Sequence, residues 1–164
     1  MIRAGLLSVI MGLWCMAGFA QSLSIDPASV TACHDATPIG ETSPACLGAA
    51  ANACQLLDGG GTTLGITECI VAEKVAWDDL LNTNYQALRD LFRGQEAIGQ
   101  DLSGEELNLR LRDAQRAWIA FRDADCSFRY DMYRGGTIRN IVGANCSLVM
   151  TAQRALELRD MANP

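Results

Sequence analysis

The chain has 164 residues, of which 49% are hydrophobic and 20% are charged, and its formal net charge is −6 at pH 7. An acidic chain is a poor match for nucleic acid or anionic lipid, because both of these partners are negatively charged. The length is sufficient for one domain with its own hydrophobic core.

The first twenty residues have the pattern of a secretory signal peptide. Arg3 supplies a positive charge, an apolar segment covers residues 6–16, and Gly18 and Ala20 are small residues near the expected cleavage point. The apolar segment is too short to span a bilayer, and no later apolar segment is longer. We therefore expect cleavage after Ala20, a periplasmic or secreted location, and no membrane insertion of the mature chain.

Two short helices are predicted next. Asp26 is a typical N-cap residue and is followed by proline, which favours a helix over residues 27–36. A serine–proline pair at 43–44 repeats this pattern and predicts an alanine-rich helix over 45–57. The three glycines at 59–61 end that helix.

Two long amphipathic helices follow. The first begins at Thr62 or Thr63 and ends near Gly94. The second begins at Ser103, which is expected to form a capping box with Glu106. Each helix has apolar residues at the 3-4 spacing of one buried face. The predicted stripes are Cys69, Ala76, Trp77, Leu80, Leu81, Tyr85, Leu88, Leu91 and Phe92 on the first helix, and Leu107, Leu111, Ala114, Trp118, Phe121 and Ala124 on the second.

A last helix begins between Thr137 and Asn145 and runs to about Met161. The predicted fold class is therefore all-α: an antiparallel helical hairpin with a returning C-terminal helix and short N-terminal helices. We expect the signal peptide at 1–20, a leader and short helix at 21–42, and the helical domain at 43–164. The aromatic residues expected to form one buried cluster between the long helices are Trp77, Tyr85, Trp118 and Phe121.

Removal of the signal peptide leaves six cysteines. An even number in an oxidising compartment favours three disulfide bonds. Zinc is the alternative, but no two cysteines have the C-x-x-C spacing of a zinc knuckle. Six cysteines allow 15 pairings, and we expect the nearest-neighbour scheme, in which each bond joins elements that flank one turn. The predicted bonds are Cys54–Cys69, Cys126–Cys146 and Cys33–Cys46.

The sequence offers little for catalysis. His34 is the only histidine, so a histidine-dependent triad depends on this one residue. The neighbouring carboxylates Asp78 and Asp79 point about 100° apart on a helix and do not converge on one atom. The glycines at 59–61 lack the lysine of a phosphate-binding loop. We therefore predict no enzyme activity, no cofactor and no metal.

Arg122 lies at the edge of the apolar stripe of the second long helix, and Asp78 occupies a similar edge of the first. A long arginine side chain can lie along an apolar surface while its guanidinium group reaches a carboxylate. The sequence thus predicts a structural ion pair between Asp78 and Arg122, with a ligand-binding role as the alternative.

Several stretches carry a resemblance to a known family. They are Glu68-Cys69, residues 77–88, residues 114–126, and Cys146 with Thr151 and Arg154. Over roughly residues 54–160 the chain resembles the family named after the lysozyme inhibitor LprI. The resemblance implies an all-helical periplasmic or cell-envelope domain with two disulfides, and lysozyme inhibition is attributed to the family through its namesake. Cys33 and Cys46 lie upstream of the family pattern.

Two classes of function follow from these observations. The first is a binding protein that occludes the cleft of a cationic lysozyme. The second is a structural or stress-related envelope domain that binds another protein or a small ligand. If the protein binds a lysozyme, we expect the exposed turns at 58–63, 95–103 and 133–137 to contact it. The candidate contact residues are Glu96, Asp101, Gly135 and Gly136.

Overall fold

The computed structural model describes residues 23–94 and 103–163, and these residues form five helices. The helices are α1 (Pro27–Ala36), α2 (Ala49–Cys54), α3 (Thr63–Gly94), α4 (Gly104–Asp131) and α5 (Ile138–Ala162). Neither described segment contains a β-strand. The predicted all-α fold is confirmed. Within the described ranges, no helix combines the length and the apolar character that a membrane crossing requires.

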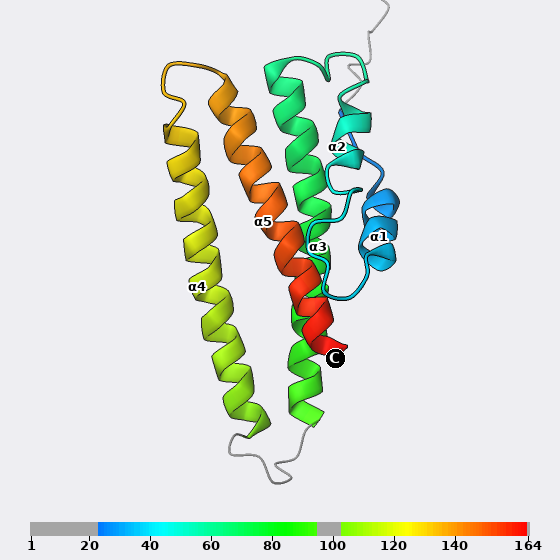
Figure 1. Ribbon diagram of the computed structural model, residues 1–164, viewed down its shortest axis with the longest axis vertical. Helices are drawn as coiled ribbons and strands as arrows, with labels where there is room; N and C mark the ends of the chain where they lie inside the picture. The colour runs from blue at the N-terminus through cyan, green and yellow to red at the C-terminus, as the bar shows by residue number, and fades with distance from the viewer. Residues whose placement is uncertain (1–22, 95–102, 164) are drawn as a thin grey trace, which may run out of the picture.

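The three long helices lie side by side, with α5 between α3 and α4 in the view of Figure 1. Helices α3 and α4 run in opposite directions, and α5 returns in the direction of α3. The most extensive contact is between α3 and α5, whereas α3 and α4 touch each other much less. The two short helices pack against the other side of α3. The hydrophobic core therefore lies mainly around α3 and α5.

Helix α1 begins as predicted from its local sequence. The Asp26 carboxylate accepts a hydrogen bond from the Ala28 amide at 3.0 Å, and Pro27 occupies the first helical position. At the other end, the Thr37 hydroxyl donates to the Cys33 carbonyl at 2.7 Å. Both ends are thus capped by residues within a few positions of the helix, which is why the sequence predicts them.

Helix α2 is much shorter than predicted: residues 45–48 form turns, and the helix covers only Ala49–Cys54. The expected serine–proline cap at 43–44 is wrong. Gly48 precedes the helix instead, in a left-handed conformation with φ 90°, which glycine adopts at no steric cost. The Glu73 side chain of α3 accepts hydrogen bonds from the Gly48 and Ala51 amides, both at 2.7 Å. A residue 25 positions away therefore determines where α2 begins.

Helix α3 buries the stripe that its periodicity predicts. Its fully buried apolar residues are Cys69, Ile70, Trp77, Leu81 and Leu88. Facing them, α5 buries Leu148, Ala152, Ala155, Leu156 and Leu158. The alanines allow the two helix backbones to approach closely, so the large side chains of α3 fill the space between them. The remaining residues of the predicted stripe are less buried: Leu91 is exposed, and the half-buried ones are Ala76, Leu80, Tyr85 and Phe92. Ile70 is buried although it was not predicted.

Helix α4 buries only part of the face that was predicted: Leu111 is buried and Leu107 is half-buried. Ala114, Phe121 and Ala124 are exposed, and Trp118 is only half-buried. The predicted aromatic cluster is therefore wrong for Phe121. The buried positions of α4 include the polar residues Asn108 and Gln115. The inward face thus combines these amides with the apolar Leu111 and Cys126, and hydrophobic spacing identifies only part of it.

Ser103 caps α4 in the predicted capping box. Its side chain accepts from the Glu106 amide at 3.2 Å, and its own amide donates to the Glu106 carboxylate at 2.8 Å. This hydrogen bond from the Ser103 amide, followed by that from the Ser103 hydroxyl, lowers the pKa of Glu106. We expect Ser103→Ala to reduce the free energy of unfolding by about 1 kcal/mol, measured by chemical denaturation. An unchanged stability would show that the cap contributes nothing.

The structure confirms all three predicted disulfide bonds. Cys33–Cys46 joins α1 to the turn before α2, Cys54–Cys69 joins α2 to α3, and Cys126–Cys146 joins α4 to α5. They close loops of 13, 15 and 20 residues. In the chain-entropy account each bond stabilises the fold by about 3 kcal/mol, because it restricts the unfolded chain. All six cysteines that follow residue 20 are bonded in pairs and are therefore not thiolate ligands for zinc.

Candidate functional site

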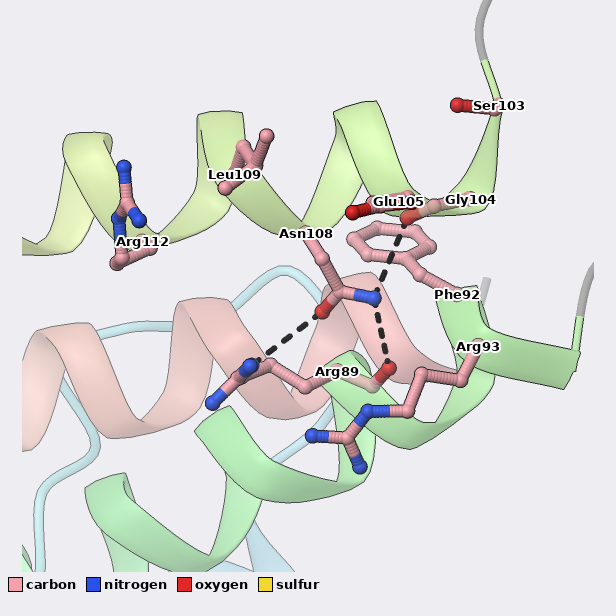
Figure 2. Close-up of a pocket in the computed structure, with 9 residues that line it drawn as sticks. All are labelled: Arg89, Phe92, Arg93, Ser103, Gly104, Glu105, Asn108, Leu109 and Arg112. Atoms are coloured by element: carbon pink, nitrogen blue, oxygen red, sulfur yellow. Dashed lines mark hydrogen bonds between the residues drawn. The ribbon is translucent and has the colours of Figure 1, made fainter.

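The contact between α3 and α4 is hollowed at two places. The first, shown in Figure 2, has a volume of about 550 Å³ and lies where α3 ends and α4 begins. Asn108 of α4 reaches across it: its amide nitrogen donates to the carbonyls of Arg89 and Gly104, both at 3.2 Å. Its oxygen accepts from Arg89 Nε at 3.3 Å. Asn108 therefore ties the start of α4 to the end of α3.

The second hollow has a volume of about 520 Å³ and is called the seam groove below. It adjoins the first hollow, because Arg89 and Arg112 line both. Five of its lining side chains are cationic and one is acidic, although the chain as a whole is acidic. The residues lining the seam groove are Lys74, Asp78, Leu81, Asn82, Tyr85, Arg89, Arg112, Gln115, Arg116, Trp118, Ile119 and Arg122.

Three of these cations have carboxylate partners. Lys74 Nζ lies 3.5 Å from Asp78, and Arg112 and Arg122 pair with the aspartates that follow them in sequence, each at 2.8 Å. Within the described segments, Arg89 and Arg116 have no carboxylate within ion-pair distance. The uncompensated positive charge of the seam groove therefore comes from one arginine on α3 and one on α4.

The predicted pair Asp78 and Arg122 lies within the seam groove. Arg122 Nη1 is 3.9 Å from the Asp78 carboxylate, a longer distance than its 2.8 Å contact with Asp123. The Arg122 guanidinium also lies 5.1 Å from the centre of the Trp118 ring. Arg122 is thus placed at the junction of the two helices, with Asp123 rather than Asp78 as its nearer partner.

Gln115 is the most unusual polar group of the seam groove. Only 7% of its surface is exposed, and its Oε1 accepts a hydrogen bond from Arg154 Nε of α5 at 3.0 Å. A guanidinium group can only donate, so this contact fixes which end of the amide is the oxygen. The buried Gln115 Nε2 has no acceptor among the described protein atoms. Leaving such a donor unsatisfied costs about 1–3 kcal/mol.

The structure describes two of the four predicted contact residues for a protein partner. Glu96 and Asp101 lie outside the described residues. Gly135 and Gly136 lie in the turn between α4 and α5, where Gly135 has φ 92°. In Figure 1 this turn and the turn before α3 are at one end, whereas α3 ends and α4 begins at the opposite end. The candidate turns at 58–63 and 133–137 are therefore at the same end of the molecule.

Large apolar side chains are exposed around the turn between α4 and α5. Phe128 and Met132 are each 63% exposed, and Tyr133 and Ile138 are about half exposed. A group of exposed apolar residues is typical of a surface that contacts another protein. None of these apolar residues was among the predicted contacts, which in this turn were Gly135 and Gly136.

The residues considered for catalysis or metal binding have structural roles. His34 is buried, and its Nε2 lies 3.0 Å from the Asn84 amide nitrogen, which also donates to the Ala155 carbonyl. His34 thus connects α1 to α3. Asp125, Cys126 and Cys146 lie close together, but the two sulfur atoms are bonded to each other and are not thiolate ligands.

Comparison with known proteins gives a family and one partial relative. The family described as lysozyme inhibitor LprI matches residues 54–158. A protein of Rhizobium meliloti (strain 1021) described as uncharacterized is 35% identical over 51 residues, which are 31% of this chain. The match covers 37% of that relative, so the chain spans little more than a third of its length. No solved structure matches the chain.

Proposed function

The chain belongs to the lysozyme inhibitor LprI family, and from this membership we propose that it is an exported envelope protein that binds and inhibits a lysozyme. The observation that carries the proposal is the family match over 54–158, which includes all three long helices almost completely. Three disulfides are consistent with a protein that works outside the cytoplasm. The signal peptide predicted at 1–20 agrees with this location and lies outside the described residues.

Charge supports a cationic partner. With the predicted signal removed, the chain carries 12 basic and 19 acidic residues, a formal charge of −7. Common lysozymes are strongly basic, so opposite net charges would accelerate their association with this protein. Because salt screens surface charges beyond about 8 Å at physiological ionic strength, inhibition should weaken as salt is added.

We place the contact at the end of the molecule that carries the α4–α5 turn. Phe128, Met132 and Tyr133 expose apolar surface there, and Gly135 and Gly136 add two positions without side chains to the turn. Exposed apolar and aromatic residues provide most of the binding free energy in protein interfaces, whereas rim charges mainly affect the association rate. This end therefore combines apolar side chains suited to a protein contact with a turn whose two glycines leave its backbone accessible.

We expect Met132→Ala to raise the concentration needed for half-inhibition of lysozyme at least about tenfold, the loss typical of a central contact residue. The measurement is clearing of a cell-wall suspension by lysozyme in the presence of the oxidised mature protein. Leu109→Ala is the matched control, because Leu109 is an exposed apolar residue near the opposite end of α4. The concentration of Leu109→Ala needed for half-inhibition should stay within about twofold of that of the unchanged protein.

Two results would contradict this placement or the function itself. A loss of inhibition by Leu109→Ala alone would move the contact to the opposite end of the molecule. Full lytic activity of several lysozyme classes, with a large excess of oxidised protein at low salt, would eliminate lysozyme inhibition.

The alternative function is a non-inhibitory envelope domain that binds another protein or a small ligand. The seam groove favours this alternative, because it combines a volume of about 520 Å³ with two arginines that have no carboxylate partner among the residues that the structure describes. We propose no enzyme activity for either function.

A further inference from the structure

We infer that the seam groove binds a small organic anion, with its charged group near Gln115 and Arg116 and its carbon part against the apolar wall. This inference concerns a different surface from the proposed lysozyme contact and does not depend on it. It rests on three features: an unsatisfied buried donor, uncompensated arginines and adjacent apolar side chains.

The unsatisfied donor indicates that the ligand supplies a hydrogen-bond acceptor. Arg154 fixes the amide orientation of Gln115, so rotation of the amide cannot exchange its nitrogen for its oxygen. The buried nitrogen is therefore left with N–H groups and no acceptor among the described protein atoms. A carboxylate or phosphate oxygen would satisfy this donor and would gain from the charged groups nearby.

The arginines indicate that the acceptor is negatively charged. Arg89 and Arg116 line the seam groove from α3 and α4, and each lacks a carboxylate partner within the described segments. A guanidinium group presents a planar fork of donors that matches carboxylate and phosphate groups. Asp78, the acidic residue of the lining, is already close to Lys74 and Arg122. The positive charge that remains is available to an anion.

The apolar wall indicates an organic ligand rather than an inorganic ion. Leu81, Trp118 and Ile119 line the same hollow as the arginines. Pockets of about 300–1,000 Å³ with an apolar lining and a few polar groups are typical small-molecule sites, and the seam groove lies within this range. The ligand class is therefore a carboxylate or phosphate attached to a compact apolar group.

Benzoate, phenyl phosphate and benzamide are suitable probes for the oxidised mature protein. Benzoate and benzamide have nearly the same shape, but only benzoate is charged. We expect benzoate, phenyl phosphate or both to produce saturable NMR shifts of the Gln115 side-chain amide and the Trp118 indole. The anion that binds more tightly, benzoate or phenyl phosphate, identifies the preferred charged group as carboxylate or phosphate. Benzamide should bind at least about tenfold more weakly, as expected when charge contributes to binding.

Arg116→Gln is the test variant, because Arg116 is exposed and its replacement should leave the fold intact. Arg134→Gln is the matched control: it removes the same charge from an exposed residue outside the seam groove. We expect Arg116→Gln to weaken the binding of the tighter anion at least about tenfold. Arg134→Gln should change the affinity for the same anion less than about twofold. Equal weakening by both variants would overturn the inference, since it would indicate only general attraction to positive charge.

Two further results would also overturn the inference that the seam groove binds an organic anion. One is equal binding of benzamide and benzoate. The other is the absence of saturable shifts up to about 10 mM of both anions, a concentration that would nearly saturate a site with a Kd of 1 mM. Neither result would affect lysozyme inhibition, which is measured without these probes and depends on the α4–α5 end.

Discussion

Replacing Glu73 by alanine is expected to lower the free energy of unfolding by at least about 3 kcal/mol. Glu73 is 1% exposed, and its carboxylate accepts three hydrogen bonds. Two come from the amides of Gly48 and Ala51 at 2.7 Å, and the third comes from the Trp77 indole at 3.3 Å. Alanine would leave all three donors without their acceptor, at about 1–3 kcal/mol for each buried donor.

The position of Glu73 explains why the loss should be large. Its carboxylate lies at the start of α2, where free amide groups and the helix dipole favour a negative charge. The same carboxylate contacts the indole of the largest core residue. Loss of Glu73 would therefore weaken the attachment of α2 to α3 as well as the core of α3.

Glu68→Ala is the control for this experiment, because Glu68 is exposed and lies on α3 one turn before Glu73. Glu73→Gln keeps one acceptor oxygen and should give an intermediate stability. The measurement is urea denaturation of the oxidised protein, followed by circular dichroism. A single hydrogen bond contributes a net stability of about 1 kcal/mol. If the free energies of unfolding of Glu73→Ala and Glu68→Ala differ by less than this amount, the proposed role of Glu73 is wrong.

The sequence predicted those features of the fold that depend on nearby residues. Asp26 and Ser103 cap α1 and α4 through groups two or three residues away. The apolar period of α3 identified Trp77, Leu81 and Leu88 because one face of this helix is buried along most of its length. Neighbouring cysteines paired as expected, since each bond joins elements that flank one turn.

Features that depend on distant residues were not predicted. The start of α2 is determined by Glu73, which lies beyond the glycine turn and in another helix. The inward face of α4 contains Asn108 and Gln115, whose partners Arg89 and Arg154 are on α3 and α5. Apolar spacing therefore identified the buried Leu111 but also selected the exposed Phe121 and did not identify the two amides.

The candidate site was predicted only in part for the same reason. Asp78 and Arg122 were placed at the edges of their helices, and both line the seam groove. The charge excess was not visible in the sequence, because Arg89 and Arg116 come from helices whose relative rotation was unknown. An arginine that lacks a carboxylate partner is recognised only when the neighbouring helices are in place.

Replacing Trp77 by alanine is expected to destabilise the fold by about 3–5 kcal/mol, as is typical of a large aromatic residue removed from a core. Trp77 is 0% exposed and lies between α1 and the α3–α5 contact. Its indole donates to Glu73, and its ring packs edge-on against the His34 ring at 6.1 Å. Alanine would leave a cavity and remove the donor that faces the buried carboxylate.

Trp118→Ala provides the comparison, because Trp118 is half-buried and forms one wall of the seam groove. Full burial of Trp118, as predicted from its place in the apolar stripe, would correspond to a loss of about 3–5 kcal/mol. Because Trp118 is only half-buried and removes less apolar surface from water, we expect a smaller loss. Trp77 and Trp118 are the two tryptophans that follow the predicted signal. Trp118→Phe therefore makes Trp77 the single fluorescent reporter of core unfolding. If Trp118→Ala destabilises the protein as much as Trp77→Ala in reversible denaturation, α4 belongs to the core as fully as α3 does, and the hollow between these helices is not an open groove.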